Sequence, residues 1–315
     1  MKKLLITLLT FVSVLGVAQQ EAQYSNYQMN NFMLNPGVAG SYPYMNVKLG
    51  ARYQWVGIQG APRTYFATFH APIHHPDAMP NTRHKFTHHG MGFSLASDQA
   101  GAFKFQSFSV TYAYHLKLNR QYTLSTGASF GLKSFSIDAN QLEFVQTTTD
   151  QSIGGTTSKA VPDGNFGFWL YSDRLFAGLA GRQLFGNNLS ISPTGGRQRL
   201  ERHYFATIGY LTDINTVWHF IPSTMIQLAA GAPMQIDLNG TFWYEKKFAV
   251  GVSYRHLDAT YLILDYVYKD ALEIGYAYDF NISKLSKYNS GTHEIIVGYQ
   301  WGNLGKKYAC PRQFW

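Results

Sequence analysis

The amino-acid sequence predicts an all-β fold, a transmembrane antiparallel β-barrel of about 14 strands. Three observations support this fold class. The chain is rich in Tyr and Phe, with 22 of each, and in Gly, with 29, yet only 14% of its residues are charged. Beyond the N-terminus, no apolar run approaches the roughly 20 residues of a membrane-spanning helix. Apolar residues instead alternate with small or polar ones, which is the pattern of strands that cross a bilayer.

Residues 1–18 have the pattern of a secretory signal peptide. A short Lys-containing positive region precedes an apolar stretch at residues 4–17, which is too short to cross a bilayer as a helix. Small residues then lead to Gln19 or Gln20, where we expect the mature chain to begin. This predicts export, with the cell outer membrane as the destination of a multi-pass barrel.

We divide the mature chain into three parts. Residues 19–42 are predicted to be a periplasmic N-terminal segment, residues 43–302 the outer-membrane β-barrel and residues 303–315 a C-terminal tail. The single Cys310 allows no disulfide within the chain.

The alternation is clearest in residues 235–244, QIDLNGTFWY, where Ile, Leu, Gly, Phe and Tyr share one face. The segments FAVGVSYRH, LEIGYAYDF and EIIVGYQWG repeat it. We interpret the small and polar face as the lining of a wet lumen, and Tyr and Trp near strand ends as interfacial girdles. A soluble β-sandwich also alternates, but its strands are usually about five or six residues long.

Counting such segments predicts 14 strands. Long connections at 137–162, 184–201 and 281–291 alternate with tight polar turns, as expected if the long ones lie outside the cell and the turns in the periplasm. The predicted strands are 43–55, 62–72, 88–98, 103–117, 121–136, 163–172, 174–183, 202–212, 217–230, 234–245, 247–257, 260–269, 271–280 and 292–302.

One connection, residues 73–87, is long although it falls on the predicted periplasmic side. Six of the 11 His lie between His70 and His89. No Cys and only Asp77 accompany them, which is a poor ligand set for a metal. We therefore predict no metal and no cofactor, and interpret this connection as a solvated loop that contacts a partner.

Other function classes find little support. The formal charge is +8, but Lys and Arg are scattered, and export makes nucleic acid an improbable partner, so we expect none. The chain has none of the common catalytic motifs. Asp258 near His256 and Asp213 near His219 are pairs expected by chance among 11 His. We therefore expect no enzyme and no catalytic residues.

Two Gly/Pro-containing phrases follow the signal peptide, NFMLNPGVAGSY at 31–42 and RYQWVGIQGAP at 52–62, and the chain ends CPRQFW. These phrases resemble the PorP/SprF family, outer-membrane β-barrels of the type IX secretion system in Bacteroidota. Its pattern combines N-P-x-x-A-G-S, R-x-Q-W-x-G-x-x-G-A-P and a C-P-x-F-W-like terminus, from which Gln313 departs as an extra residue. The matching positions are Asn35, Pro36, Ala39, Gly40 and Ser41, then Arg52, Gln54, Trp55, Gly57, Gly60, Ala61 and Pro62, and finally Cys310, Pro311, Phe314 and Trp315.

The resemblance implies a role in protein export. SprF-like members support secretion and surface display of large adhesins, including those of gliding motility, whereas PorP-like members are core components that contact periplasmic subunits. The sequence leaves these two roles open, and a general porin is a third alternative. The implied partners are type IX secretion components, the C-terminal domain of a cognate adhesin and outer-membrane lipid.

We expect a protein-binding site at Asn35, Pro36, Gly40, Trp55, Gly57, Phe314 and Trp315. For the first five, barrel-closing turns are an equally open interpretation. The last two resemble the terminal aromatic residues read by barrel-assembly machinery. We also expect Tyr24, Tyr27 and Phe32 to be aromatic anchors on the periplasmic face.

Overall fold

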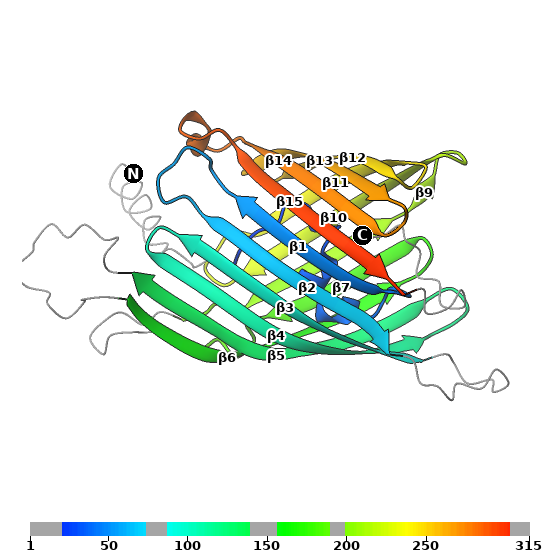
Figure 1. Ribbon diagram of the computed structural model, residues 1–315, viewed down its shortest axis with the longest axis horizontal. Helices are drawn as coiled ribbons and strands as arrows, with labels where there is room; N and C mark the ends of the chain where they lie inside the picture. Colours follow the sequence, from blue (N-terminus) through cyan, green and yellow to red (C-terminus); the bar gives the residue numbers. More distant parts are fainter. Residues whose placement is uncertain (1–20, 74–86, 139–155, 190–198, 303–315) are drawn as a thin grey trace, which may run out of the picture.

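The chain folds into one closed antiparallel sheet (Figure 1), in a computed structural model that describes residues 21–73, 87–138, 156–189 and 199–302. Its 15 strand segments make 14 crossings, because β8 and β9 both pair with β10 and belong to one crossing. The bounds are β1 Met45–Tyr53, β2 Arg63–Ile73, β3 His88–Ala100, β4 Phe103–Lys117, β5 Thr123–Asp138, β6 Thr156–Tyr171, β7 Leu175–Arg182, β8 His203–Tyr210, β9 Thr212–Asp213, β10 Trp218–Ala229, β11 Gln235–Tyr244, β12 Phe248–Arg255, β13 Ala259–Tyr268, β14 Leu272–Asn281 and β15 Thr292–Trp301.

The barrel closes where β15 pairs with β1, from Met45 opposite Trp301 to Tyr53 opposite His293. Every other crossing pairs with its neighbours along the chain. This confirms the predicted 14-strand antiparallel barrel. The predicted strand bounds agree closely, except that β6 begins seven residues earlier than expected, at Thr156.

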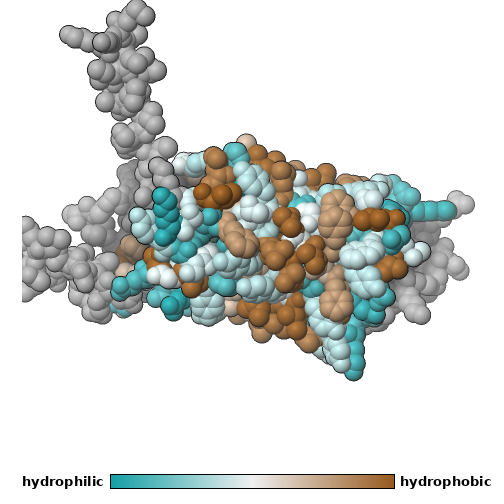
Figure 2. Space-filling view, turned by 90° about the horizontal axis from the view of Figure 1, so that it is seen from above, coloured by the Kyte–Doolittle hydropathy of each residue, from teal (hydrophilic) through white to brown (hydrophobic). Residues whose placement is uncertain are grey.

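The outward face of the strands is apolar. In β11 and β12, exposed and buried positions alternate, and the exposed ones include Leu238, Phe242 and Val250. Figure 2 shows hydrophobic side chains spread over the middle of one side of the molecule. Such a belt is what a barrel that crosses a bilayer presents to lipid.

Among the described residues, no helix is long and apolar enough to cross a membrane.

The two ends of the barrel differ. Tight turns at 172–174, 245–247 and 269–271 lie at one end, which we call the short-turn end. At the opposite, long-loop end, β7 ends and β8 begins, and the connection 282–291 contains the short 3-10 helix η4 (Lys284–Lys287). In outer-membrane barrels the short turns are periplasmic and the longer loops are extracellular.

Residues 21–44 lie inside the barrel, where Figure 1 shows them in dark blue, and we call them the plug. Glu21 lies beside Arg182 at the long-loop end, and Tyr44 leads into β1 at the short-turn end. The plug therefore runs the length of the lumen. It contains two short helical turns, α2 (Asn31–Leu34) and η2 (Pro36–Val38).

This position differs from the expected periplasmic segment at residues 19–42. Tyr24, Tyr27 and Phe32, expected to be surface anchors, are each at most 5% exposed. A barrel of this size has a lumen that small inward side chains leave unfilled. The aromatic side chains of the plug fill it, and burial of each contributes about 1.5–3 kcal/mol. Over the described residues, the small inward face receives the plug, which corrects the interpretation of a wet lumen.

Candidate functional site

The turn Asn35–Pro36–Gly37 anchors the plug to the barrel wall. The Asn35 side chain accepts a hydrogen bond from the Gly37 N–H at 2.9 Å and so caps η2, whose first residue is Pro36. Its amide nitrogen donates to the carbonyl oxygens of Phe168, at 2.8 Å, and Leu179, at 3.3 Å. These two residues face each other across β6 and β7. One Asn side chain thus ties the turn to two strands.

Three glycines make room for this turn. Gly127, Gly167 and Gly178 lie on the neighbouring strands β5, β6 and β7. A Cβ at Gly127 would overlap the backbone of Pro36, and a Cβ at Gly167 or Gly178 would run into the Asn35 side chain. Glycine is needed at Gly127 because the plug backbone approaches the strand closely. At Gly167 the Asn35 side chain takes the space that a Cβ would need, and at Gly178 the Trp169 ring and Asn35 do. We call these three residues the glycine seat.

A second close approach lies nearer the short-turn end. Gly40 has a φ of +76°, which favours glycine, and a Cβ there would lie 2.5 Å from the Gly90 Cα on β3. A Cβ at Gly90 would in turn overlap the carbonyl oxygen of Ala39. Plug and wall therefore meet backbone to backbone.

Three histidines bind the same two plug residues. His115 Nε2 lies 2.7 Å from the Ala39 carbonyl oxygen, and His88 Nε2 lies 3.0 Å from that of Gly40. Because a carbonyl oxygen can only accept, both Nε2 atoms carry the proton. His70 Nδ1 accepts from the Gly40 N–H at 3.3 Å, and the His88 and His115 rings stack at 4.2 Å. We call these three side chains the histidine clasp. In the described part of the chain, no cluster of three or more His, Cys, Asp or Glu side chains could hold a metal.

The first part of the plug, residues 21–30, contacts a wall of charged side chains. The two oxygens of Glu294 accept from the backbone N–H groups of Ser25 and Asn26, both at 2.9 Å. The Ser25 hydroxyl donates to Asp279 at 2.7 Å. Glu294 of β15 thus holds the plug backbone, and Asp279 of β14 holds the Ser25 side chain, through charge-assisted hydrogen bonds.

Cations on β1 balance these carboxylates. Lys48 donates to the Met29 carbonyl oxygen and forms an ion pair with Glu273 at 3.1 Å. Arg52 pairs with Asp279 at 2.9 Å. All of these charged side chains are at most 2% exposed, so each depends on its partner rather than on solvent.

A further buried pair joins β11 and β12. Arg255 contacts Asp237 at 3.0 Å and donates to the carbonyl oxygen of Tyr24 at 3.2 Å. The Tyr261 hydroxyl donates to the same carboxylate at 3.1 Å. The pair therefore connects the barrel wall to the plug.

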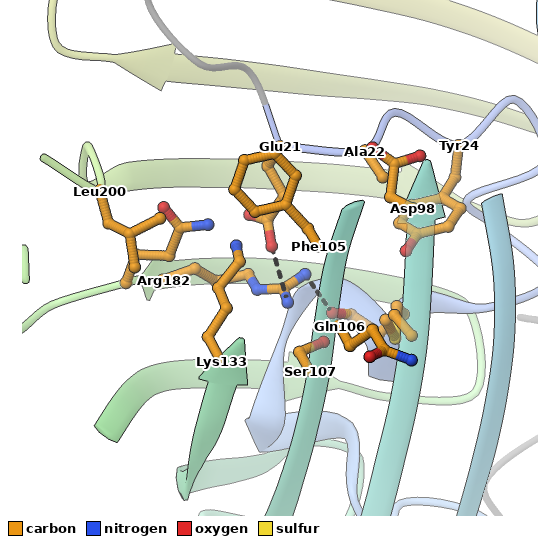
Figure 3. Close-up of a pocket in the computed structure, with 13 residues that line it drawn as sticks. Glu21, Ala22, Tyr24, Asp98, Phe105, Gln106, Ser107, Lys133, Arg182 and Leu200 are labelled. Carbon is orange, nitrogen blue, oxygen red and sulfur yellow. Dashed lines mark hydrogen bonds and ion pairs between the residues drawn. The ribbon is translucent and has the colours of Figure 1, made fainter. Parts of the chain in front are cut away.

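At the long-loop end, Glu21 forms an ion pair with Arg182 at 2.8 Å. Arg182 also donates to the carbonyl oxygen of Met33 at 2.7 Å. Figure 3 shows Glu21 and Arg182 pointing toward each other, with Lys133 beside them, in a pocket lined by strands and plug. We call the Glu21–Arg182 pair the latch.

The structure separates the residues predicted to bind a protein partner. Asn35, Pro36 and Gly40 are plug residues, all buried in the lumen. Trp55 and Gly57 lie in the β1–β2 connection at the long-loop end, where Gly57 is exposed.

The β1–β2 connection is itself ordered by its neighbour. The Trp55 N–H donates to Thr292 Oγ1 at 3.2 Å, and Val56 exchanges backbone hydrogen bonds with Ser290 and Gly291. The remaining two predicted positions, 314 and 315, lie outside the described residues.

The sequence analysis missed the wall residues that hold the plug. Two signals could have revealed them. One is glycine at inward positions of adjacent strands, as at Gly127 and Gly167. The other is charge inside otherwise membrane-like strands, as at Lys48, Asp237 and Glu273, because charges at this depth need partners.

Comparison with known proteins gives both a family and a fold. Residues 16–299 match the family described as "Type IX secretion system membrane protein PorP/SprF". No curated protein matches the chain. Among solved structures, the toluene transporter TbuX of Ralstonia pickettii is 9% identical, with a TM-score of 0.50 over 87% of this chain and 92% of TbuX. Outer membrane protein Omp33 of Acinetobacter baumannii is 10% identical, with a TM-score of 0.46 over 82% and 98% of the two chains.

At such low identity, the likeness to TbuX shows the outer-membrane β-barrel fold alone. The family match, by contrast, covers nearly all of the barrel together with the plug. The chain belongs to the PorP/SprF family of type IX secretion system membrane proteins.

Proposed function

We propose that this protein supports the secretion and surface display of a cognate large adhesin, in the manner of the SprF-like members of its family. The observation that carries the proposal is the filled lumen. Residues 21–44 occupy the interior and bond to most of the surrounding strands. A barrel filled by its own chain offers its two ends and its outer wall to other molecules, which suits a docking role.

The filled lumen also counts against a general porin. A porin of this class conducts through a water-filled interior lined by polar side chains. Here, the inward side chains that such a channel would hydrate, including Lys48, Asp237 and Arg255, are at most 2% exposed. We expect no steady conductance from this protein.

The short-turn end is the docking face that we favour for the adhesin's C-terminal domain or for periplasmic secretion subunits. With the N-terminal segment inside the lumen, the sequence leaves two candidates at this end, the connection 73–87 and the tail 303–315. Most of the first and all of the second lie outside the described residues. Phe314 and Trp315 would supply aromatic anchors of the kind that dominate protein interfaces.

The test is to replace residues 75–87 with Asn-Gly, a dipeptide that suits a two-residue hairpin. As a matched control, residues 140–154, which follow β5 and precede β6 in the sequence, are replaced by a short Gly-Ser linker. We expect the first variant to keep heat-modifiable gel migration, as a folded barrel does, while adhesin at the cell surface falls. The control should retain display. If the first variant displays normally while deletion of the gene abolishes display, the docking face is not at the short-turn end.

A further inference from the structure

The two halves of the plug differ in composition. Residues 21–30, EAQYSNYQMN, contain no Leu, Ile, Val or Phe, and their one charged residue is Glu21. Residues 31–44, NFMLNPGVAGSYPY, carry Phe32, Leu34 and Val38, and continue directly into β1. The first half carries more polar side chains, although its Tyr24, Tyr27 and Met29 are buried in a hydrophobic cluster. The second half is more apolar and joins β1 directly.

The parts of the barrel wall that contact the two halves of the plug differ in the same way. The second half rests on the glycine seat and the histidine clasp, which lie on β2 to β7. At Gly90 and Gly127 its backbone lies directly against strand backbone. The first half lies mainly against the charged wall, a set of three cations and five carboxylates with a formal net charge of −2. Its members are Lys48 and Arg52 of β1, Asp237 of β11, Arg255 of β12, Asp265 of β13, Glu273 and Asp279 of β14, and Glu294 of β15.

Some buried polar atoms of the charged wall lack a hydrogen-bond partner. Among the described residues of this wall, Glu273 Oε1 and Asp279 Oδ1 are buried without a hydrogen-bond partner. Arg52 Nε and Glu273 Oε2 make no hydrogen bond and are held by ion pairs, with Glu294 at 3.7 Å and Lys48 at 3.1 Å. Ion pairs at this depth seldom stabilise a fold better than apolar side chains would, because desolvation offsets their attraction. Buried polar atoms without partners need an explanation. A state of the barrel in which water reaches the charged wall and hydrogen-bonds to these atoms provides that explanation.

The contacts of the first half are suited to reversible release. Tyr27 hydrogen-bonds to Ser223 at 2.8 Å, and Asn26 to Asp265 at 2.6 Å. Water can replace such polar partners on both sides. At the glycine seat, by contrast, departure of the second half would leave apolar and backbone surface without contacts. The latch holds Glu21, the first residue of this half, against β7.

We propose that residues 21–30 form a gate that swings out of the lumen about Asn30–Asn31, while residues 31–44 remain seated. The open state is a water-filled passage along β1 and β11 to β15. Because carboxylates outnumber cations in its lining, the passage prefers cations. This gate is independent of adhesin display and differs from a porin in being closed at rest.

The first test compares two inward alanines, both 0% exposed, in a Cys310→Ser background. Ala277 lies between Gly275 and Asp279 on β14, beneath the first half, and Ala113 packs with the second half. Each is replaced by Cys, and a membrane-impermeant methanethiosulfonate is added to folded protein. Labelling of Ala277→Cys at least about tenfold faster than Ala113→Cys supports the gate. Equal rates, or protection of both, overturn it.

The second test measures conductance in planar bilayers. Wild-type protein should be closed with rare openings, and Glu21→Gln, which breaks the latch, should raise the open fraction by about tenfold. The control is Glu245→Gln, which removes an exposed ion pair in the β11–β12 turn. In a KCl gradient, the current through Glu21→Gln should reverse at a potential close to the equilibrium potential of K⁺, as expected of a passage that prefers cations. A permanently closed Glu21→Gln barrel with normal heat-modifiable migration, or openings selective for anions, would reject the proposal.

Discussion

Gly127 of β5 pairs directly with Gly167 of β6, so two strands present bare backbone side by side where the plug makes its Asn-Pro-Gly turn. This pairing explains why a strand interior tolerates two residues of low β propensity. What the strands lose in propensity is offset by the close packing of the turn.

The glycine seat gives the first prediction. Gly127→Val should lower the free energy of unfolding by about 1–3 kcal/mol, because the new side chain overlaps Pro36 and a packed interior accommodates extra atoms poorly. Ala128→Val is the matched control, since Ala128 is the next residue and points outward, where it is exposed. Thermal unfolding in detergent, followed by heat-modifiable migration, measures both. Equal stability of the two variants would show that the plug does not need the seat.

A second prediction separates the destabilisation caused by backbone strain from that caused by steric overlap with neighbouring atoms. Gly40 and Gly57 both have positive φ, but a Cβ at Gly57 would meet no atom within 4 Å, while one at Gly40 would meet Gly90 and Ala71. Gly57→Ala should therefore cost only the strain of a left-handed residue, about 1–2 kcal/mol. Gly40→Ala should cost more than that, as judged by the midpoint of thermal unfolding. A smaller loss at Gly40 would mean that plug and β3 are not in close contact.

The third prediction concerns the buried pair Arg255–Asp237. Arg255→Met should lower the free energy of unfolding by about 3–5 kcal/mol, because it leaves a buried carboxylate without its cation. Adding Asp237→Leu should restore much of the loss, and a double-mutant cycle measures the coupling. Lys247→Met, in an exposed pair with Glu245, is the control and should change stability by no more than about 1 kcal/mol. An additive cycle would contradict the pairing.

The barrel itself was predictable from the sequence because the alternation of apolar and polar residues can be seen within each strand. Each strand alternates between lipid and lumen, so segments such as 235–244 can be read without knowing their neighbours. The strand count was predicted in the same way, by counting such segments along the chain. At β6 the prediction missed the first seven residues, TTSKAVP, which lack a clear apolar alternation and contain a proline. Pairing with β5 from Thr156 onward, not an intrinsic pattern, makes them a strand.

The plug was not predictable in the same way, because its position depends on contacts far apart in sequence. Ser25 meets Glu294, and Asn35 meets Leu179. A polar, aromatic segment behind a signal peptide looks like a surface segment when read alone. Its burial becomes evident only when the inward glycines and charges of distant strands are seen as one surface.

The last prediction tests Asn35, which the sequence marked as a protein-binding residue and the structure places at the anchor of the plug. Asn35→Asp keeps the shape and the oxygen that caps η2, but replaces the amide donor with a carboxylate oxygen facing the carbonyl oxygens of Phe168 and Leu179. We expect a loss of about 2–4 kcal/mol in the free energy of unfolding, since two hydrogen bonds are lost and a buried charge gains no partner.

Asn119→Asp is the control for this change. In the β4–β5 turn, the Asn119 side-chain oxygen accepts from the backbone N–H groups of Gln121 and Tyr122 at 2.8 Å, which a carboxylate can also do in an exposed site. That variant should stay within about 0.5 kcal/mol of the wild type. Thermal unfolding of the two variants in the same detergent decides the matter. If Asn35→Asp is as stable as Asn119→Asp, Asn35 does not anchor the plug, and a role in binding a partner becomes the better explanation for this residue.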